Sequence, residues 1–274
     1  MKIKYNLLLN NYFFSKIVFS SLLLVSSFPE ISAFELSPAV TTLEPAGIKA
    51  TQVYLLTNSN KEPAAIQFNV TTRQQRSNGS EIRNSANDLF KIHPAQVVIP
   101  AGGTQKIRLK WLGKKKVTRE QAYRFIAQQL PINLSKKKGA NMNLVMKFEA
   151  SLYVKPKNGS HNTLNNKTAN QVSVIQPNNK NNKLVNLTIA AVQVVNTPQG
   201  KQLLLRVSNP SNEHIILDNA TVQVSSGIRS IKINGKQLGN MSGQNLLARA
   251  TRNFTMPIPT SFVQQQKWTG KFIN

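Results

Sequence analysis

The sequence predicts an all-β protein made of two immunoglobulin-like β-sandwich domains. Apolar and polar residues alternate over many short segments, as they do in strands that bury one face. Turn-forming residues separate these segments, and no long 3.6-residue apolar period follows the N-terminal region. The chain has 274 residues, 40% of them hydrophobic, which is enough for two separate cores.

The N-terminus predicts export. Several lysines precede an apolar run at residues 17–25, and small residues follow up to Ala33. A positive region, a short apolar region and a small-residue end are typical of a cleavable signal peptide, here residues 1–33. The apolar run is short for a transmembrane helix, although an uncleaved membrane anchor is the alternative. We therefore expect an exported protein with no stable membrane insertion.

Residues 34–156 are predicted to form the first sandwich. The apolar run at 53–57 suits a central strand, and Thr118 starts one candidate helical turn. The sequence Pro-Ala-Gly-Gly at 100–103 predicts a turn. About seven short strands in such a span are typical of an immunoglobulin-like domain. The other strand patterns lie at 66–71, 107–111, 123–128 and 141–156.

The last of these patterns carries large apolar residues at every second position: Met142, Leu144, Met146 and Phe148. On a strand they share one face. Such a strand at a sheet edge can pair with another chain. The alternative is an ordinary core strand with one buried face.

The rest of the chain divides into a linker and a second domain. Residues 157–183 are rich in Asn and Lys and predict a linker or long loop with one short strand inside it. Residues 184–274 are predicted to form a smaller β-sandwich, with Asn234-Gly235 as a hairpin signal. Its strand patterns lie at 184–195, 202–208, 215–217, 221–224, 230–233, 254–258 and 268–273.

Catalytic and metal-binding patterns are missing from the sequence. The chain has no cysteine, and its three histidines stand apart from any metal-ligand spacing. Its few carboxylates are scattered among separate segments, and no nucleophile, phosphate-loop or dinucleotide motif occurs. We expect a protein that is not an enzyme and has no metal or other cofactor.

The charge is strongly positive, with 35 basic and 10 acidic residues and a net charge of +25. Nucleic acid, an anionic membrane surface and acidic polypeptides are the partners that fit such a charge. The basic residues are spread along the chain without interleaved aromatic residues, so we expect no nucleic-acid partner. A basic envelope protein that binds nucleic acid or anionic lipid remains an alternative. The affinity of such a protein for DNA or lipid vesicles would depend strongly on salt concentration.

Several motifs, in order and spacing, resemble the periplasmic pilus-assembly chaperones of the chaperone–usher pathway. The start of the predicted mature chain, Phe34-Glu-Leu-Ser-Pro-Ala, resembles their first strand. The resemblance continues through Leu55-Leu-Thr-Asn58 with Pro63, Phe90-Lys-Ile-His-Pro94, Val98-Ile-Pro-Ala-Gly102, Gln105-Lys-Ile-Arg108, Tyr123-Arg-Phe with Leu130-Pro131, Leu152-Tyr-Val-Lys-Pro156 and Leu205-Arg-Val-Ser-Asn-Pro210.

The resemblance implies two immunoglobulin-like domains set at an angle, with a cleft between them. It implies a periplasmic chaperone that completes the unfinished sandwich of a pilus subunit with its own seventh strand, a process called donor-strand complementation. The donor residues are then Met142, Leu144 and Met146, with Phe148 continuing the stripe. Further expectations are delivery to an outer-membrane usher, no need for ATP, and a self-capping homodimer of the free protein.

One departure concerns the subunit's C-terminal carboxylate. The best-known chaperones hold it with an Arg on strand one and a Lys on strand seven, where this chain has Ala39 and Ser151. Arg124 and Lys147 are the predicted replacements, with Arg108 in reserve. An anchor four residues earlier lies about 13 Å along the strand, a feature associated with the divergent, archaic branch of the family. The alternative is that these cations are solvated or pair with Glu120 or Glu149.

A second function class remains open, because a secreted sandwich adhesin or fimbrial structural protein has a similar strand pattern. A structural subunit polymerises or binds a host ligand, and it tends to carry a short N-terminal donor extension. In this sequence Phe34 begins directly in a strand pattern. That start favours the chaperone.

Overall fold

The structure is a computed structural model. It describes residues 34–131, 145–156, 172–174, 185–218, 220–258 and 267–273. The predicted signal peptide and most of the predicted linker lie outside these residues. The described part belongs to one compact unit, Ala33–Asn274, and it holds two hydrophobic cores.

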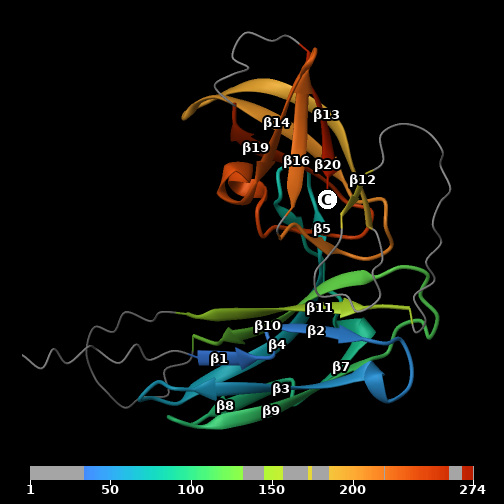
Figure 1. The fold of residues 1–274 in the computed structure, drawn as a ribbon. Coiled ribbons are helices and arrows are strands. Elements are labelled where there is room, and N and C mark those ends of the chain that lie inside the picture. Colours follow the sequence, from blue (N-terminus) through green and yellow to red (C-terminus); the bar gives the residue numbers. More distant parts are fainter. Residues whose placement is uncertain are drawn as a thin grey trace, which may run out of the picture. The chain divides into compact units, whose positions relative to one another are not determined.

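The predicted all-β fold is confirmed: the described residues form two β-sandwiches, and their only helical segments are short 3₁₀ turns (Figure 1). In the first sandwich one sheet has the strand order β1-β3-β9-β7 and the other the order β2-β11-β10-β4-β8. The strands are β1 (Phe34–Ser37), β2 (Val40–Leu43), β3 (Thr51–Asn58), β4 (Ala64–Thr72), β7 (Phe90–His93), β8 (Gln96–Ile99), β9 (Thr104–Trp111), β10 (Gln121–Gln129) and β11 (Lys147–Val154).

Alternation decides which side chains fill this first core. On β9, Ile107 and Leu109 are buried and the basic residues that alternate with them, Lys106, Arg108 and Lys110, are exposed, as predicted. Strand β3 lies between β1 and β9, in the predicted central position. Its apolar run is buried on one face only, because Val53 and Leu55 lie on the outer face of the sheet.

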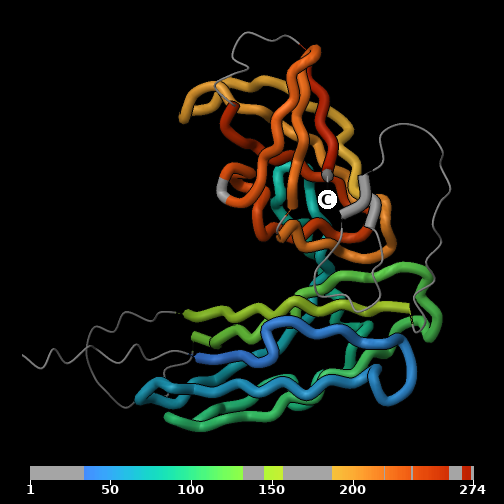
Figure 2. Tube along the Cα trace, viewed as in Figure 1, coloured from blue at the N-terminus to red at the C-terminus, as the bar shows by residue number. Residues whose placement is uncertain are grey.

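The N-terminal segment contributes to both sheets of this sandwich. Strand β1 pairs with β3, and after Pro38 the chain crosses to the other sheet, where β2 pairs in parallel with β11. Figure 2 shows this segment, in blue, running beside the yellow-green β11. The β2–β11 pairing joins only Ser151–Val154 of β11 to β2, so the first half of β11 is left without β2.

The second sandwich has sheets in the orders β12-β13-β14-β19 and β17-β16-β20, and a small β15–β18 pair. Its core includes Leu203, Leu205, Val222, Phe254 and Phe272. The strands are β12 (Val172–Val174), β13 (Val185–Thr197), β14 (Gly200–Ser208), β15 (Ile215–Ile216), β16 (Thr221–Ser226), β17 (Arg229–Asn234), β18 (Asn245–Leu246), β19 (Thr251–Pro257) and β20 (Thr269–Ile273).

Two local predictions are wrong. The hairpin signal Asn234-Gly235 leads into a 3₁₀ segment, η3 (Gly235–Met241), and the β16–β17 hairpin turns at Gly227 instead. Both glycines have positive φ, so either satisfies a tight turn, and strand pairing selects Gly227. The candidate helical turn at Thr118 is a bend, because Glu120 there turns inward to contact His214.

Candidate functional site

Strand β11 has one open edge. It pairs with β10 along its whole length, from Lys147 to Val154, but with β2 only from Ser151 onward. Residues 147–150, here called the open edge, therefore have a strand partner on one side only within the described ranges. An unpaired strand edge presents backbone donors and acceptors that another chain can pair with.

Two hydrogen bonds fix which backbone groups face outward along this edge. The Gln129 N–H donates to the Met146 carbonyl at 2.9 Å, so even-numbered residues of β11 face β10. The Ser151 N–H donates to the Ala39 carbonyl at 2.8 Å, on the β2 side. Because backbone direction alternates along a strand, the N–H and C=O groups of Lys147 and Glu149 face the open edge.

The apolar side chains of this segment face the core of the first sandwich. Met146 and Phe148 are half-buried and pack against that core, and the rings of Phe34 and Phe148 lie 5.5 Å apart. The same face continues as the fully buried Ala150, Leu152 and Val154. The shared face of Met146 and Phe148 is thus as predicted, whereas Met142 and Leu144 lie outside the described residues.

The opposite face of β10 and β11 carries a charged group that we call the arginine–glutamate cluster. A two-strand hairpin, β5 (Gln74–Gln75) and β6 (Glu81–Ile82), brings three of its members beside β10. Strands β10 and β11 supply the other three. The cluster consists of Arg73, Glu81, Arg83, Arg124, Lys147 and Glu149.

Glu81 is the centre of the cluster. Its Oε1 accepts from Arg73 at 2.6 Å and from Arg124 at 2.7 Å, and its Oε2 accepts from Arg83 at 2.6 Å. Burial alone raises the pKa of such a carboxyl, but hydrogen bonds from Arg124, Arg73 and Arg83 and the charge of Arg73 outweigh burial and lower the Glu81 pKa to about 2. Glu81 therefore stays ionised and holds three arginines in place.

Glu149 is the outer carboxylate, on the open edge. Its Oε1 lies 2.6 Å from Arg83 and 3.1 Å from Lys147, whereas the cation nearest to Oε2 in the described part of the chain is Arg124, at 4.0 Å. Burial acts to raise the Glu149 pKa, and hydrogen bonds from Arg83 and Lys147 lower it overall. Arg83 has a raised pKa, with the hydrogen bond to Glu149 as the largest cause.

The structure brings two of the three predicted anchor residues together. Arg124 donates to the Ser151 hydroxyl at 2.8 Å and pairs with Glu81, and Lys147 pairs with Glu149. In the free chain Lys147 therefore pairs with Glu149, which is the alternative to a free anchor that the sequence left open. Arg108 lies on the outer face of the other sheet, about 10 Å of packed core away.

Sequence reasoning missed the hairpin residues Arg73, Glu81 and Arg83. A signal was present, because Asn78-Gly79 is a typical two-residue turn and Gly79 has a φ of 88°. The contact between this hairpin and β10 joins residues about 40 positions apart, and no local pattern encodes it.

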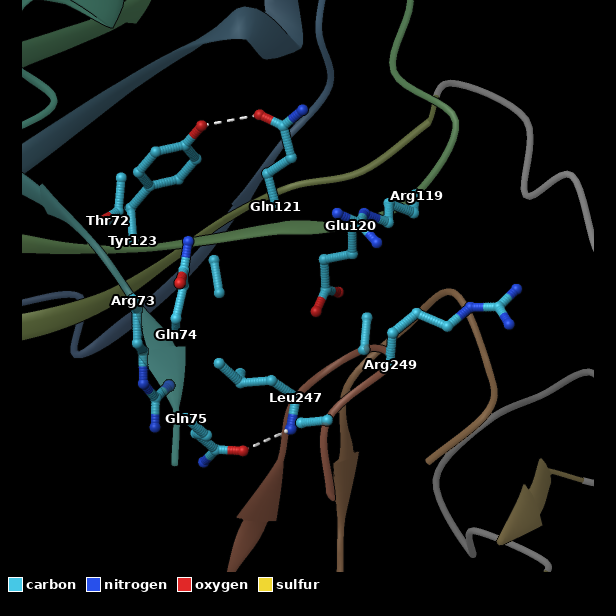
Figure 3. Close-up of a pocket in the computed structure, with 13 residues that line it drawn as sticks. Thr72, Arg73, Gln74, Gln75, Arg119, Glu120, Gln121, Tyr123, Leu247 and Arg249 are labelled. Atoms are coloured by element: carbon cyan, nitrogen blue, oxygen red, sulfur yellow. Dashed lines mark hydrogen bonds between the residues drawn. The ribbon is translucent and has the colours of Figure 1, made fainter. Parts of the chain in front are cut away.

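A second feature is a polar cavity of about 480 Å³ between segments of the two sandwiches (Figure 3). Figure 3 shows Arg73, Gln74 and Gln75 from the hairpin side and Leu247 and Arg249 from the second sandwich. The Leu247 N–H donates to the Gln75 side chain at 2.9 Å. No cluster of three or more His, Asp or Glu suited to a metal occurs among the described residues.

Buried Glu120, beside this cavity, joins the two sandwiches. Its Oε1 accepts from the His214 backbone N–H at 3.0 Å and lies 2.8 Å from His214 Nδ1, and Lys155 lies 3.5 Å from Oε2. The His214 ring stacks on Tyr153, with centroids 4.1 Å apart. The Tyr153 hydroxyl also accepts hydrogen bonds from Arg73 and Asn245. Through Arg73, Tyr153 is connected to the arginine–glutamate cluster.

The described residues include no helix with the length and apolar character needed to cross a membrane. Residues 33–160 match the sequence model of a family described as "Pili and flagellar-assembly chaperone, PapD N-terminal domain". No curated protein matches the sequence.

Among solved structures, the chain is similar to the crystal structure of the CsuC–CsuE chaperone–tip adhesion subunit pre-assembly complex from archaic chaperone–usher Csu pili of Acinetobacter baumannii. That match has 18% identity and a TM-score of 0.50, and it covers 88% of this chain and 98% of that chain. Another is the E. coli chaperone DraB, with 14% identity, a TM-score of 0.47 and coverage of 84% and 86%. The first of these likenesses shows the two-sandwich fold.

Proposed function

We propose that this chain, whose residues 33–160 match the family model of pili and flagellar-assembly chaperones, binds, folds and caps pilus subunits by donor-strand complementation. The lent strand is β11 with the residues that precede it. The proposal includes a periplasmic location after removal of residues 1–33 and delivery of the capped subunit to an outer-membrane usher. It also includes membership of the divergent, archaic branch.

The observation that carries the proposal is the open edge. Residues 147–150 offer outward backbone groups at Lys147 and Glu149, beside half-buried Met146 and Phe148. An unfinished sandwich lacks one strand, so it needs backbone pairing and a row of apolar side chains, and this segment has both.

The apolar stripe supplies the driving force. Four large side chains contribute roughly 6–12 kcal/mol when fully buried, at about 1.5–3 kcal/mol each. Met146 and Phe148 already rest partly on their own core, so their gain is smaller, and ordering costs reduce the total further. Met142 and Leu144 complete the stripe in the proposal.

Capture is tested by co-expressing the chain with a pilus subunit from the same organism. In the parent chain we expect a soluble binary complex. Met146→Asp places a charge in the apolar contact and lowers complex recovery more than tenfold, with little change in Tm. Val145→Asp is the matched control, because Val145 is 43% exposed and lies next to Met146, outside the every-second-position apolar stripe. Equal recovery with Met146→Asp would refute the donor-strand assignment.

For the anchor, we propose that Arg124 and Lys147 hold the subunit's C-terminal carboxylate. They lie on the same face of β10 and β11, beside the open edge. Replacing both by Ala removes the stable complex, because the carboxylate loses its charge-assisted hydrogen bonds. The matched control replaces Lys106 and Arg108, on the other sheet, by Ala. Loss of the complex in the control alone would point to Arg108 instead.

A fimbrial structural protein, the competing reading, gives a different result in the same preparation. Such a protein polymerises when expressed alone and is not recovered as a one-to-one complex. We expect the chain alone to be a monomer or a self-capped dimer by light scattering, because two open edges can cover each other.

A further inference from the structure

We infer that Glu149 is an internal counter-ion that occupies the carboxylate site of the free chaperone, and that the terminal carboxylate of the captured strand displaces it. Arg83 is the third cation of that site. The inference rests on the proposed function, because it concerns the same open edge. The ligand is the free carboxyl terminus of a β-strand.

The charge of the arginine–glutamate cluster favours a further anion. Four cations, Arg73, Arg83, Arg124 and Lys147, face two carboxylates, Glu81 and Glu149. The cluster thus carries two surplus positive charges. Its members are one-half exposed or less, so the surplus is only partly screened by water.

The two carboxylates differ in how firmly they are held. Glu81 is bound by three arginines through both oxygens, and its side chain is only 13% exposed. Glu149 is 23% exposed, and among the described residues its Oε2 has no cation nearer than Arg124, at 4.0 Å. Glu149 also lies on the open edge, whereas Glu81 lies on the hairpin. Glu149 is therefore the carboxylate that an arriving group can replace.

Strand geometry places the arriving carboxylate beside these cations. A strand added along residues 147–150 lies about 4.8 Å from β11, and it pairs with the outward groups of Lys147 and Glu149. A carboxylate at its end then meets Lys147 and Arg83, the two groups that now hold Glu149. Arg124, whose Nε lies 4.0 Å from Glu149 Oε2, reaches the same carboxylate while it keeps its bonds to Glu81 and to the Ser151 hydroxyl at 2.8 Å.

A displaceable counter-ion gives selectivity. A strand that ends in a carboxylate replaces Glu149 and keeps every cation paired. A strand that continues past this point, or ends in an amide, leaves Glu149 in place and gains backbone pairing only. The site therefore distinguishes the end of a chain from its middle, and it fixes the register of strand addition.

The test compares two peptides that correspond to the C-terminal strand of a pilus subunit from the same organism. One has a free carboxyl terminus and the other is amidated. We expect the parent chain to prefer the free acid. Glu149→Gln removes the competitor and binds the free acid roughly three- to tenfold more tightly, with the amide unchanged. Arg83→Gln lowers the preference for the free acid, and Arg83→Lys restores part of it.

The control is Glu35→Gln, on the exposed outer face of β1, for which both affinities stay at the parent values. Weaker or unchanged binding of the free acid by Glu149→Gln, with normal amide binding, would overturn the counter-ion role and leave the donor strand intact. Failure of the parent chain to bind either peptide or the whole subunit would instead overturn the proposed function, and the inference with it.

Discussion

At the scale of single residues, Glu81 organises the candidate site. One carboxylate holds Arg73, Arg83 and Arg124, at 2.6 to 2.7 Å. Removing a carboxylate from such a group leaves three partly buried guanidinium groups with too few acceptors, which is costly. The positions of Arg83 and Arg124 therefore depend on a residue that is itself not on the open edge.

The stability of the fold should fall in acid because of Glu81. Its pKa is about 2 in the folded chain, against an ordinary value of 4.5. A lowered carboxyl pKa stabilises the fold above the ordinary value, and this stabilisation is lost as the pH falls from about 4.5 towards 2. We expect a loss of roughly 1–3 kcal/mol over that window in chemical denaturation.

Glu81→Gln tests the assignment, because the variant is less stable at pH 7 and loses less stability between pH 4.5 and 2. Glu35→Gln is the control and keeps the parent profile. A Glu81→Gln variant with the parent's acid profile would show that other carboxyls cause the acid sensitivity.

The sequence predicted part of this residue-scale arrangement. The family resemblance placed Arg124 on the strand next to β11, and Lys147 could be selected because it shares the facing parity of Ser151, since a period of two fixes the face. Arg73, Glu81 and Arg83 could not, because their role depends on the hairpin reaching the outer face of β10. That contact comes from tertiary packing, which single-sequence patterns do not contain.

At the scale of elements, the important fact is that β2 pairs with only half of β11. The alternating apolar residues in the sequence predicted a long strand with one apolar face. It did not predict where the edge opens, because this depends on the crossing of the N-terminal segment at Pro38 from one sheet to the other. The open edge ends at Ser151, because pairing between β2 and β11 begins there.

A proline at position 147 tests the outward direction of the backbone. The Lys147 N–H faces the open edge, so Lys147→Pro leaves the β10 ladder intact and removes one donor for an added strand. We expect subunit affinity to fall about three- to tenfold, as for one hydrogen bond, with Tm nearly unchanged. Affinity is measured by titration calorimetry.

Lys147→Gln separates the lost charge from the lost amide, since it keeps the N–H. Phe148→Pro is the contrasting variant, because the Phe148 amide faces β10, and it should lower the Tm strongly. Equal loss of Tm in Lys147→Pro and Phe148→Pro would contradict the assigned backbone direction.

At the scale of the whole molecule, two separate cores account for the two predicted sandwiches. Alternation in the sequence identified most strands of both, because one-sided burial leaves a clear period of two. The turn at Gly227 and the 3₁₀ segment η3 were not predicted, since Asn-Gly fits several turn types. The contacts of Glu120 with His214 and Lys155 could not be predicted from the sequence either, because they join residues far apart in the chain.

Glu120 should contribute to the stability of the whole chain. Its side chain is 1% exposed and contacts His214 and Lys155. Glu120→Ala leaves His214 without its acceptor and Lys155 with Glu213 alone, and it lowers the free energy of unfolding by about 3–5 kcal/mol. Glu213→Gln, at a half-exposed partner of Lys155, is the control and should cost less than about 1 kcal/mol. Chemical denaturation gives both values, and equal values would contradict a structural role for Glu120.

Amide hydrogen exchange of the chain, alone and in complex with its subunit, tests the central claim most directly. In the free chain the Lys147 and Glu149 amides should exchange quickly, while the Ser151 amide, bonded to Ala39, should be protected. In the complex the Lys147 and Glu149 amides should become protected as well. If they exchange equally fast with and without the subunit, the open edge of β11 is not where the subunit binds.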